Sequence, residues 1–225
     1  MTYPVIRAQG PHEVKWDGES GSSVARQTTA SRVIAKSKNA ALKATPGVKA
    51  KDDDLAVFEK EDHVFAWFTG TFDGKKGTAS GIEISLALFR EAQRVEIAQY
   101  GRGFDGIFGF SQGAITSSLL SVLAAEGERA PISPRFAIFA GGAPFTVFEQ
   151  DSEELFSRIA PIKIPSVHMI GTKDKTIDPS LSYQLEGLFD ESTRVRISHP
   201  FGHIVPYDDA SLAKLEAFLD GFYQS

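Results

Sequence analysis

The stretch around Ser111 constrains the fold of this chain most strongly. Residues 107–110 are apolar and predict a buried strand, and residues 114–125 predict a helix. Between them, Gly109, Ser111 and Gly113 fit the pattern Gly-x-Ser-x-Gly. Such a strand-to-helix turn exposes the serine hydroxyl, and we expect both glycines to be needed because the backbone leaves no room for side chains. The sequence therefore predicts a nucleophilic serine at a tight turn.

Strands and helices alternate on both sides of this turn. Short apolar or alternating runs predict strands over 63–68, 134–140, 164–170 and 194–198, and helical spacing predicts helices over 82–97, 151–159, 179–188 and 210–222. Continuous apolar strands that alternate with helices are typical of a parallel sheet with helices on both faces. We therefore predict an α/β fold with a mostly parallel sheet, in which the alternating run 194–198 lies near the sheet edge.

Composition narrows the class of protein. A length of 225 residues suits one α/β domain, and a net charge of −5 disfavours binding to nucleic acid or anionic membranes. The absence of cysteine excludes disulfides, a cysteine nucleophile and thiolate metal sites. The sequence has no apolar run of membrane-spanning length and no signal-peptide core at its start. We expect a cytoplasmic protein with a single domain over 1–225 and a mobile, polar segment at 17–54.

A serine hydroxyl needs a base, usually histidine, which is held in turn by a carboxylate. Asp174 follows the predicted strand 164–170, and His203 lies in the loop after the strand 194–198. The carboxyl ends of parallel strands gather at one edge of a sheet, so these side chains are expected to meet Ser111 there. The chain order serine, acid, histidine is the order found in α/β hydrolases.

Each partner has a competitor. Asp178 could be the acid, but it precedes Pro179 and is better placed to cap the helix that begins there. His199 competes with His203, although Gly202 favours His203 by letting the loop bring its imidazole inward. We expect two further groups to be structural: His168, inside an apolar strand, as a satisfied core histidine, and Asp105 in the turn before the strand 107–110.

These motifs resemble the FSH family of small eukaryotic serine hydrolases, within the α/β-hydrolase superfamily. The matching pieces are Pro11-His12-Glu13-Val14, Ala66-Trp67-Phe68, Gly103-Phe104-Asp105-Gly106 running into 109–114, 165–171 with Asp174, and 199–203 with Val205-Pro206. The resemblance covers nearly the whole chain and implies carboxylesterase or thioesterase activity on small acyl esters or thioesters. It implies Ser111 as nucleophile, Asp174 as orienting acid and His203 as base. It also implies the backbone N–H of Gln112 as an oxyanion donor, with no metal or cofactor.

One departure from the family pattern concerns the N-terminal part. The family begins with a strand ending in His-Gly, then a helix, then a strand that runs into Pro-His-Glu-Val, which here starts at residue 11. The family's His-Gly loop supplies the second oxyanion donor. We therefore expect an incomplete N-terminal part of the fold, from an incomplete chain or a degenerate member. The alternative function is a non-catalytic or vestigial protein that lacks a complete oxyanion hole, and acyl transfer to an alcohol is a third possibility.

Overall fold

The computed structural model describes residues 12–15, 63–73, 75–127, 130–148 and 153–223. The segment 17–54, for which the sequence predicts mobility, lies outside these ranges. Strands β1 (His12–Lys15) and β2 (His63–Ala66) pair antiparallel in a small sheet of their own. The larger sheet carries the candidate site.

The larger sheet has four parallel strands in the order β3-β4-β5-β6. They are β3 (Gly106–Phe110), β4 (Phe136–Ala140), β5 (Ser166–Gly171) and β6 (Arg194–His199). The parallel sheet is confirmed, and β6 lies at its edge as predicted. Because all four strands run the same way, their carboxyl ends form one edge, where the loops that carry the candidate residues begin.

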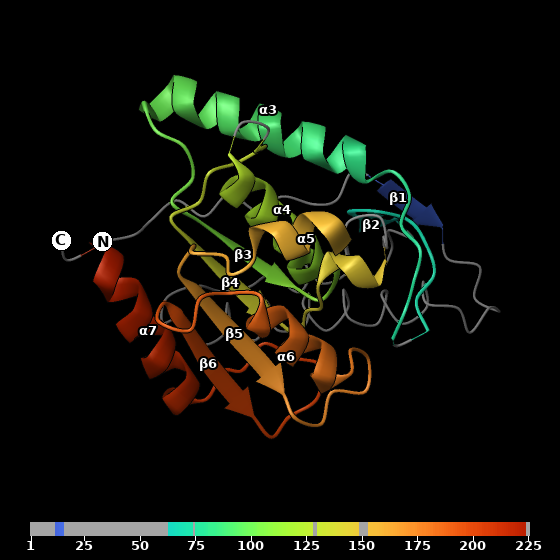
Figure 1. Ribbon diagram of the computed structural model, residues 1–225, viewed down its shortest axis with the longest axis vertical. Helices are drawn as coiled ribbons and strands as arrows, with labels where there is room; N and C mark the ends of the chain where they lie inside the picture. The colour runs from blue at the N-terminus through green and yellow to red at the C-terminus, as the bar shows by residue number, and fades with distance from the viewer. Residues whose placement is uncertain (1–11, 16–62, 74, 128–129, 149–152, 224–225) are drawn as a thin grey trace, which may run out of the picture.

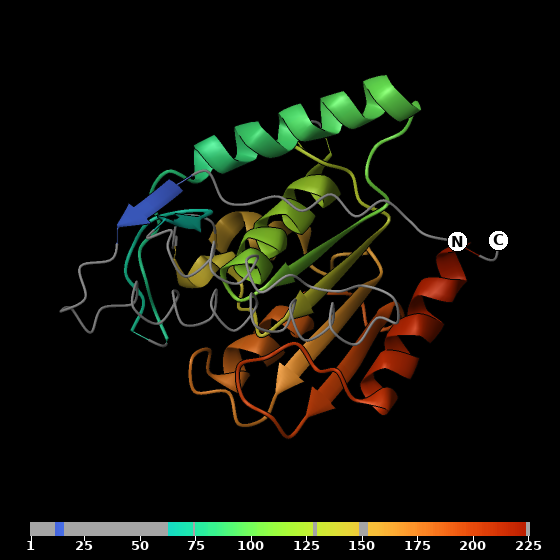
Figure 2. The same ribbon diagram turned by 180° about the vertical axis from the view of Figure 1, so that it is seen from behind.

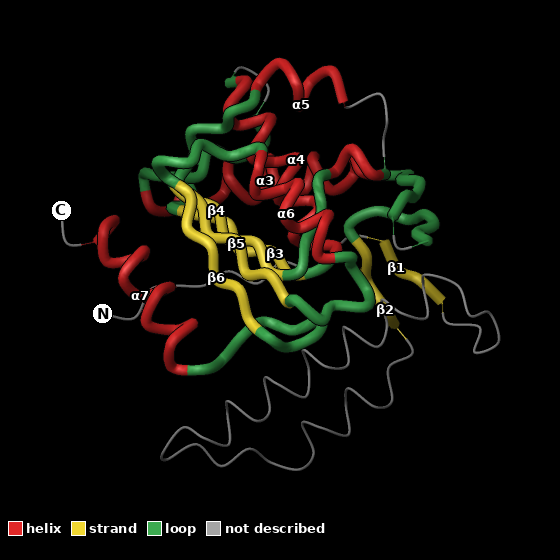
Figure 3. Tube along the Cα trace, turned by 60° about the horizontal axis from the view of Figure 1, so that its bottom comes forward, coloured by secondary structure: helices red, strands yellow, loops and turns green. Residues whose placement is uncertain are grey.

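Helices cover both faces of this sheet. They are α3 (Ile82–Tyr100), α4 (Gln112–Glu126), α5 (Glu153–Ile159), α6 (Pro179–Gly187) and α7 (Asp209–Tyr223), with a short 3-10 turn, η1 (Phe145–Val147). The strand order follows the chain order, so right-handed crossovers place α4, α5 and α6 on the same face. Figure 3 shows these helices on one side of the sheet and α7 on the other. Figures 1 and 2 show α3 and α7 at opposite ends of the molecule, with the sheet between them.

Two hydrophobic cores follow from this layering. On the α4 side, Phe139 of β4 packs in a cluster with Ile115 of α4 and Leu185 of α6. On the α7 side, Ile138 of β4 packs with Ile197 of β6 and with a stripe of apolar side chains from α7. Alternate residues of β4 therefore serve opposite cores, which explains why all five residues of this strand are buried.

The strands and helices predicted beyond residue 104 are present, with bounds that differ by no more than two residues. One detail was wrong. Phe108, predicted as part of a buried strand, is 54% exposed, and β3 is an edge strand of the four-stranded sheet. Leu212 of α7 is exposed, outside the apolar stripe that packs on the sheet. In α3, the apolar residues Ile84, Leu88 and Val95 are exposed as well.

Membrane insertion finds no support in the described helices. None of them combines the length and the apolar character that a bilayer crossing requires.

Candidate active site

Ser111 occupies the sharp turn between β3 and α4. Its backbone has φ 56° and ψ −123°, and among the described residues it is the one non-glycine residue with a positive φ. Its N–H donates to the carbonyl of Ala140 at 3.0 Å, and its own carbonyl accepts from Ala114 and Ile115. A backbone held in so sparsely populated a region costs about 1–3 kcal/mol and persists where the surroundings fix it on both sides. The predicted strand–turn–helix context of Ser111 is therefore confirmed.

The two glycines of the motif differ in the room that their surroundings leave for a side chain. A Cβ atom on Gly109 would lie 2.4 Å from the Gly113 carbonyl oxygen and 2.6 Å from the backbone of Ala114. A Cβ atom on Gly113 would meet nothing closer than the indole nitrogen of Trp67, at 3.6 Å. The expectation that both positions exclude a side chain is therefore correct for Gly109 and wrong for Gly113. The crowding arises where the strand passes close to the first turn of the helix.

Asp174 and His203 meet across the carboxyl edge of the sheet. Oδ2 of Asp174 accepts from Nδ1 of His203 at 2.7 Å. Oδ1 of Asp174 accepts from the backbone N–H groups of Thr176 and Ile177, at 2.8 and 3.0 Å. Both side chains are nearly buried, with 3% and 9% of their side-chain surface exposed. The carboxylate is thus fixed by two backbone donors and presents its second oxygen to the imidazole.

The loops that carry these two residues are joined backbone to backbone. Thr172 donates to the carbonyl of His199 at 2.9 Å, and Lys173 donates to the carbonyl of Phe201 at 3.2 Å. A Cβ atom on Gly171 would lie 2.4 Å from the carbonyl oxygen of Gly202, so the two loops approach as closely as backbone permits. The pairing of β5 with β6 therefore continues beyond the strands and brings Asp174 to His203.

The imidazole of His203 also lies beside the Ser111 turn. Its ring centroid is 4.8 Å from that of Phe110, the residue before Ser111. It lies 3.0 Å from the position that a Cβ atom would take on Gly141, which follows the carbonyl that holds the Ser111 N–H. Its Nε2 atom is buried and has no hydrogen-bond partner among the described residues. The structure thus brings Ser111, Asp174 and His203 into one neighbourhood and leaves a buried imidazole nitrogen available.

Asp178 caps the helix that begins at Pro179, as the sequence predicted. It is the N-cap of α6 and accepts from the Ser180 N–H at 2.9 Å. Hydrogen bonding by the side chain of Ser180, and then by its backbone N–H, holds the pKa of the Asp178 carboxyl below the usual range. Asp105 binds Arg102 at 2.7 Å, and its carbonyl accepts from Arg135. Both aspartates therefore have structural partners of their own.

His168 is buried in the core as predicted, although only one of its ring nitrogens is satisfied. Its Nε2 lies 2.9 Å from the Ser166 hydroxyl, while Nδ1 has no hydrogen-bond partner in the ranges that the structure describes. The ring stacks on Phe139 and meets Phe189 edge on. Burial, assisted by the positive charges of Arg194 and Arg196, lowers the pKa of His168 to about 3. The ring is therefore neutral near pH 7.

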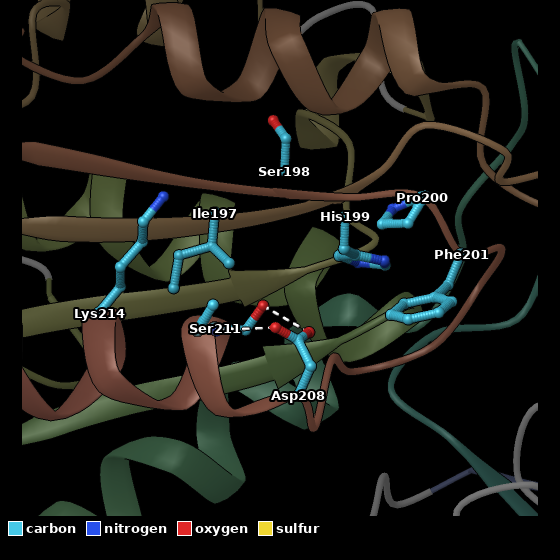
Figure 4. A pocket seen from close by; sticks show the side chains of 9 residues that line it. Ile197, Ser198, His199, Pro200, Phe201, Asp208, Ser211 and Lys214 are labelled. Atoms are coloured by element: carbon cyan, nitrogen blue, oxygen red, sulfur yellow. Dashed lines mark hydrogen bonds between the residues drawn. The ribbon is translucent and has the colours of Figure 1, made fainter.

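His199, the competitor of His203, lies elsewhere. Its imidazole is buried, and neither ring nitrogen has a hydrogen-bond partner within the described part of the chain. Burial lowers its pKa against the opposing effect of the carboxylates of Asp208 and Asp174. It lines a pocket of about 290 Å³ between β6 and α7. Figure 4 shows His199 and Phe201 at one end of this pocket and Lys214 at the other. Neither Ser111 nor His203 lines this pocket.

The side chain of Gln112 contributes contacts that the sequence did not predict. Its Oε1 accepts from the N–H of Trp67 at 2.8 Å, and its Nε2 donates to the carbonyl of Phe68 at 2.9 Å. The sequence shows a long amide side chain between the glycines of the motif. It gives no indication of the partners of this amide, because they lie more than forty residues away in sequence. No group of three or more acidic or histidine side chains in the described ranges could hold a metal ion.

Comparison with known proteins identifies the family of this chain. The profile of a family described as serine hydrolase (FSH1) matches residues 18–215. The esterase C25G4.2 of Caenorhabditis elegans is 33% identical over 172 residues, which cover 73% of this chain and 74% of that protein. The human esterase OVCA2 is 33% identical over 186 residues, 79% of this chain and 77% of that protein.

Solved structures share the fold at lower identity. The crystal structure of acyl-protein thioesterase 2 from Zea mays superposes with a TM-score of 0.52 at 18% identity. The match covers 74% of this chain and 75% of that one, and it supports the α/β-hydrolase fold. With the family profile spanning most of the sequence, the chain belongs to the FSH1 serine hydrolase family.

Proposed function

We propose that this serine hydrolase cleaves acyl esters or thioesters through a triad of Ser111, His203 and Asp174. The observation that carries the proposal is the 2.7 Å contact between Nδ1 of His203 and Oδ2 of Asp174, beside the Ser111 turn. The ionised carboxylate keeps the proton on Nδ1, so Nε2 carries the lone pair that a general base needs. That nitrogen is buried and makes no hydrogen bond to any residue that the structure describes, so it is free to receive the Ser111 proton.

The reaction follows from these positions. Nε2 of His203 takes the Ser111 proton as Oγ attacks the carbonyl carbon, and the carbonyl electrons move onto oxygen. The imidazolium then protonates the departing alcohol or thiol, which leaves an acyl group on Ser111. Water attacks this acyl-enzyme with His203 again as base, the acid is released, and the serine proton returns. Asp174 stabilises the imidazolium in both halves.

The negative charge on the carbonyl oxygen needs donors. Gln112 is the first residue of α4, where backbone N–H groups have no partner within the helix. Its N–H is the donor that we assign to the oxyanion, and the positive end of the helix dipole adds to its effect. Removing one such donor typically slows turnover about 10²–10³-fold. This donor therefore accounts for a substantial part of the expected rate.

The substrate class rests on the relatives. The worm and human relatives are named esterases, and the maize structure of similar fold is a thioesterase. An oxygen ester and a thioester present the same carbonyl to Ser111 and differ in the leaving group. We therefore propose small acyl esters or thioesters as substrates, with hydrolysis as the reaction.

Turnover of two matched substrate series tests this function. The purified chain is expected to hydrolyse p-nitrophenyl esters and acyl thioesters of increasing chain length, with a burst of alcohol or thiol before the steady state. Ser111→Ala should abolish both the burst and the turnover. A folded chain that releases neither product from either series would contradict the proposal and favour a non-catalytic member of the family.

A further inference from the structure

The Gln112 side chain connects the start of α4 to the segment that follows β2. Its amide accepts from the N–H of Trp67 and donates to the carbonyl of Phe68. These two backbone groups follow directly after β2, whereas Gln112 follows Ser111 at the start of α4. The amide therefore pairs with the segment 67–68 as a neighbouring strand would, with one donor and one acceptor.

The segment 67–68 is fixed on its other side as well. The hydroxyl of Ser85, a fully buried residue of α3, donates to the carbonyl of Trp67. The indole of Trp67 stacks on Phe89 of α3 with centroids 4.7 Å apart. The ring of Phe68 is buried against Phe145 and Phe148. A continuous set of contacts thus runs from α3 through the segment 67–68 to the residue after the nucleophile.

We infer that the side chain of Gln112 is a positioning residue for the reaction. It fixes the Ser111 turn against the segment 67–68, so that the backbone N–H of Gln112 is held in the direction of the oxyanion. The inference rests on the proposed function, because it assigns this second role to a residue whose N–H serves the same site.

The strain at Ser111 explains why such a clamp is needed. The Ser111 N–H is held by Ala140 on the β4 side, and the Ser111 carbonyl is held by the first turn of α4. Without the side-chain amide of Gln112, the opposite side of the turn loses both of its hydrogen bonds to the segment 67–68. A strained turn that is freed on one side relaxes, and a displacement of about 1 Å at reacting groups can cost about 100-fold in rate.

Gln112→Met tests the clamp, because methionine has a similar length and cannot make either hydrogen bond. The chain contains two tryptophans, so in a Trp16→Phe background, with excitation selective for tryptophan over the five tyrosines, the emission reports on Trp67. In that background, Gln112→Met is expected to raise acrylamide quenching of Trp67. It should also slow fluorophosphonate labelling of Ser111 at least about tenfold. Ester hydrolysis should show the loss in kcat, with KM within about twofold, because the clamp orients reacting groups and does not bind substrate.

Gln93→Met is the matched control. The Oε1 atom of Gln93 accepts from the N–H of Phe104 at 3.2 Å, so this variant also removes an amide-to-backbone bond, but away from Ser111. Its labelling rate is expected to stay within about twofold of the parent. A parent chain that does not label at all would refute the proposed function, whereas the quenching of Trp67 would still report on the clamp.

Two results would overturn the inference. One is a labelling rate for Gln112→Met equal to that of Gln93→Met, and the other is unchanged quenching of Trp67. If Gln112→Met gives no cooperative urea transition, the variant is not folded and Ser85→Ala replaces it as the test. Ser85→Ala removes the hydrogen bond to the carbonyl of Trp67 and leaves the Ser111 turn unchanged. Ser85→Ala is then expected to raise Trp67 quenching and slow labelling, and parental values for both would refute the clamp.

Discussion

Nδ1 of His203 lies 2.7 Å from Oδ2 of Asp174, although twenty-nine residues separate them in sequence. The contact is made by two loops that follow neighbouring parallel strands and are themselves joined by backbone hydrogen bonds. Because the other carboxylate oxygen is held by two backbone donors, the Asp174 side chain has little freedom to turn away. In the proposed mechanism, this pairing determines which nitrogen of His203 acts as the base.

Asp174→Asn should disable the enzyme without unfolding it. The amide can occupy the same place, but it no longer requires a proton on Nδ1, so Nε2 is protonated in the neutral ring and cannot act as base. We expect kcat for ester hydrolysis to fall about 10⁴-fold. The matched control is Asp178→Asn, which keeps an N-cap of equal quality at α6 and should leave kcat within about twofold. Equal losses in the two variants would contradict the assignment of Asp174.

Substitution of His203 and of His199 should have different effects on the labelling of Ser111. His203→Ala removes the base, and labelling of Ser111 by a fluorophosphonate should slow at least about 10³-fold. His199→Leu replaces a buried imidazole without partners by an apolar side chain, which is typically neutral or stabilising. We expect this variant to keep its labelling rate and its free energy of unfolding within about 1 kcal/mol. Loss of labelling in His199→Leu alone would reverse the two assignments.

The glycines around Ser111 give a second matched pair. Gly109→Ala would force a methyl group to within 2.4 Å of the Gly113 carbonyl oxygen, and we expect the free energy of unfolding to fall by about 1–3 kcal/mol. Gly113→Ala has room and lies inside α4, where alanine is favoured over glycine by about 1 kcal/mol. Urea denaturation should therefore show a lower free energy of unfolding for Gly109→Ala and a higher one for Gly113→Ala. A destabilised Gly113→Ala variant would contradict this reading of the turn.

Acid should destabilise the protein through His168. Its pKa is about 3 in the folded protein and 6.5 when exposed, so below pH 6.5 the unfolded chain binds a proton that the folded protein does not. Stability from this group is present above pH 6.5 and is lost as pH falls towards 3, by about 1.4 kcal/mol for each pH unit. Urea denaturation at pH 7.5 and pH 5 measures the loss.

His168→Gln is the variant that isolates this effect. Glutamine can retain a hydrogen bond to Ser166 but does not titrate in this range. The difference in unfolding free energy between pH 7.5 and pH 5 should therefore shrink by about 2 kcal/mol relative to the parent. An unchanged difference would show that His168 takes up its proton equally in both states.

The fold was predictable from the sequence where the hydrophobic pattern was continuous. The runs that became β4 and β5 are buried on both sides, so their apolar character marked them as central parallel strands. Exposure was harder to predict, because it depends on which strand is at the edge. Phe108 looked like a core residue, and only the strand order shows that it lies on an edge strand, where it is exposed.

Some features of the candidate site could likewise be predicted from the sequence, and others could not. Asp174 and His203 were predictable because each follows a strand, and the ends of parallel strands converge. The Gln112 clamp was not, because hydrogen bonds between residues more than forty apart leave no local pattern. The different tolerance of Gly109 and Gly113 also depends on how the strand approaches the helix, which the motif alone does not specify.

Fluorophosphonate labelling followed by peptide mass spectrometry tests the central claim most directly. The reagent phosphonylates an activated serine, and the modified peptide identifies the position. The account predicts one modified residue, Ser111, with labelling that vanishes in Ser111→Ala and slows sharply in His203→Ala. A folded chain that stays unlabelled, or a label on any other serine, would contradict the assignment of Ser111 as the nucleophile.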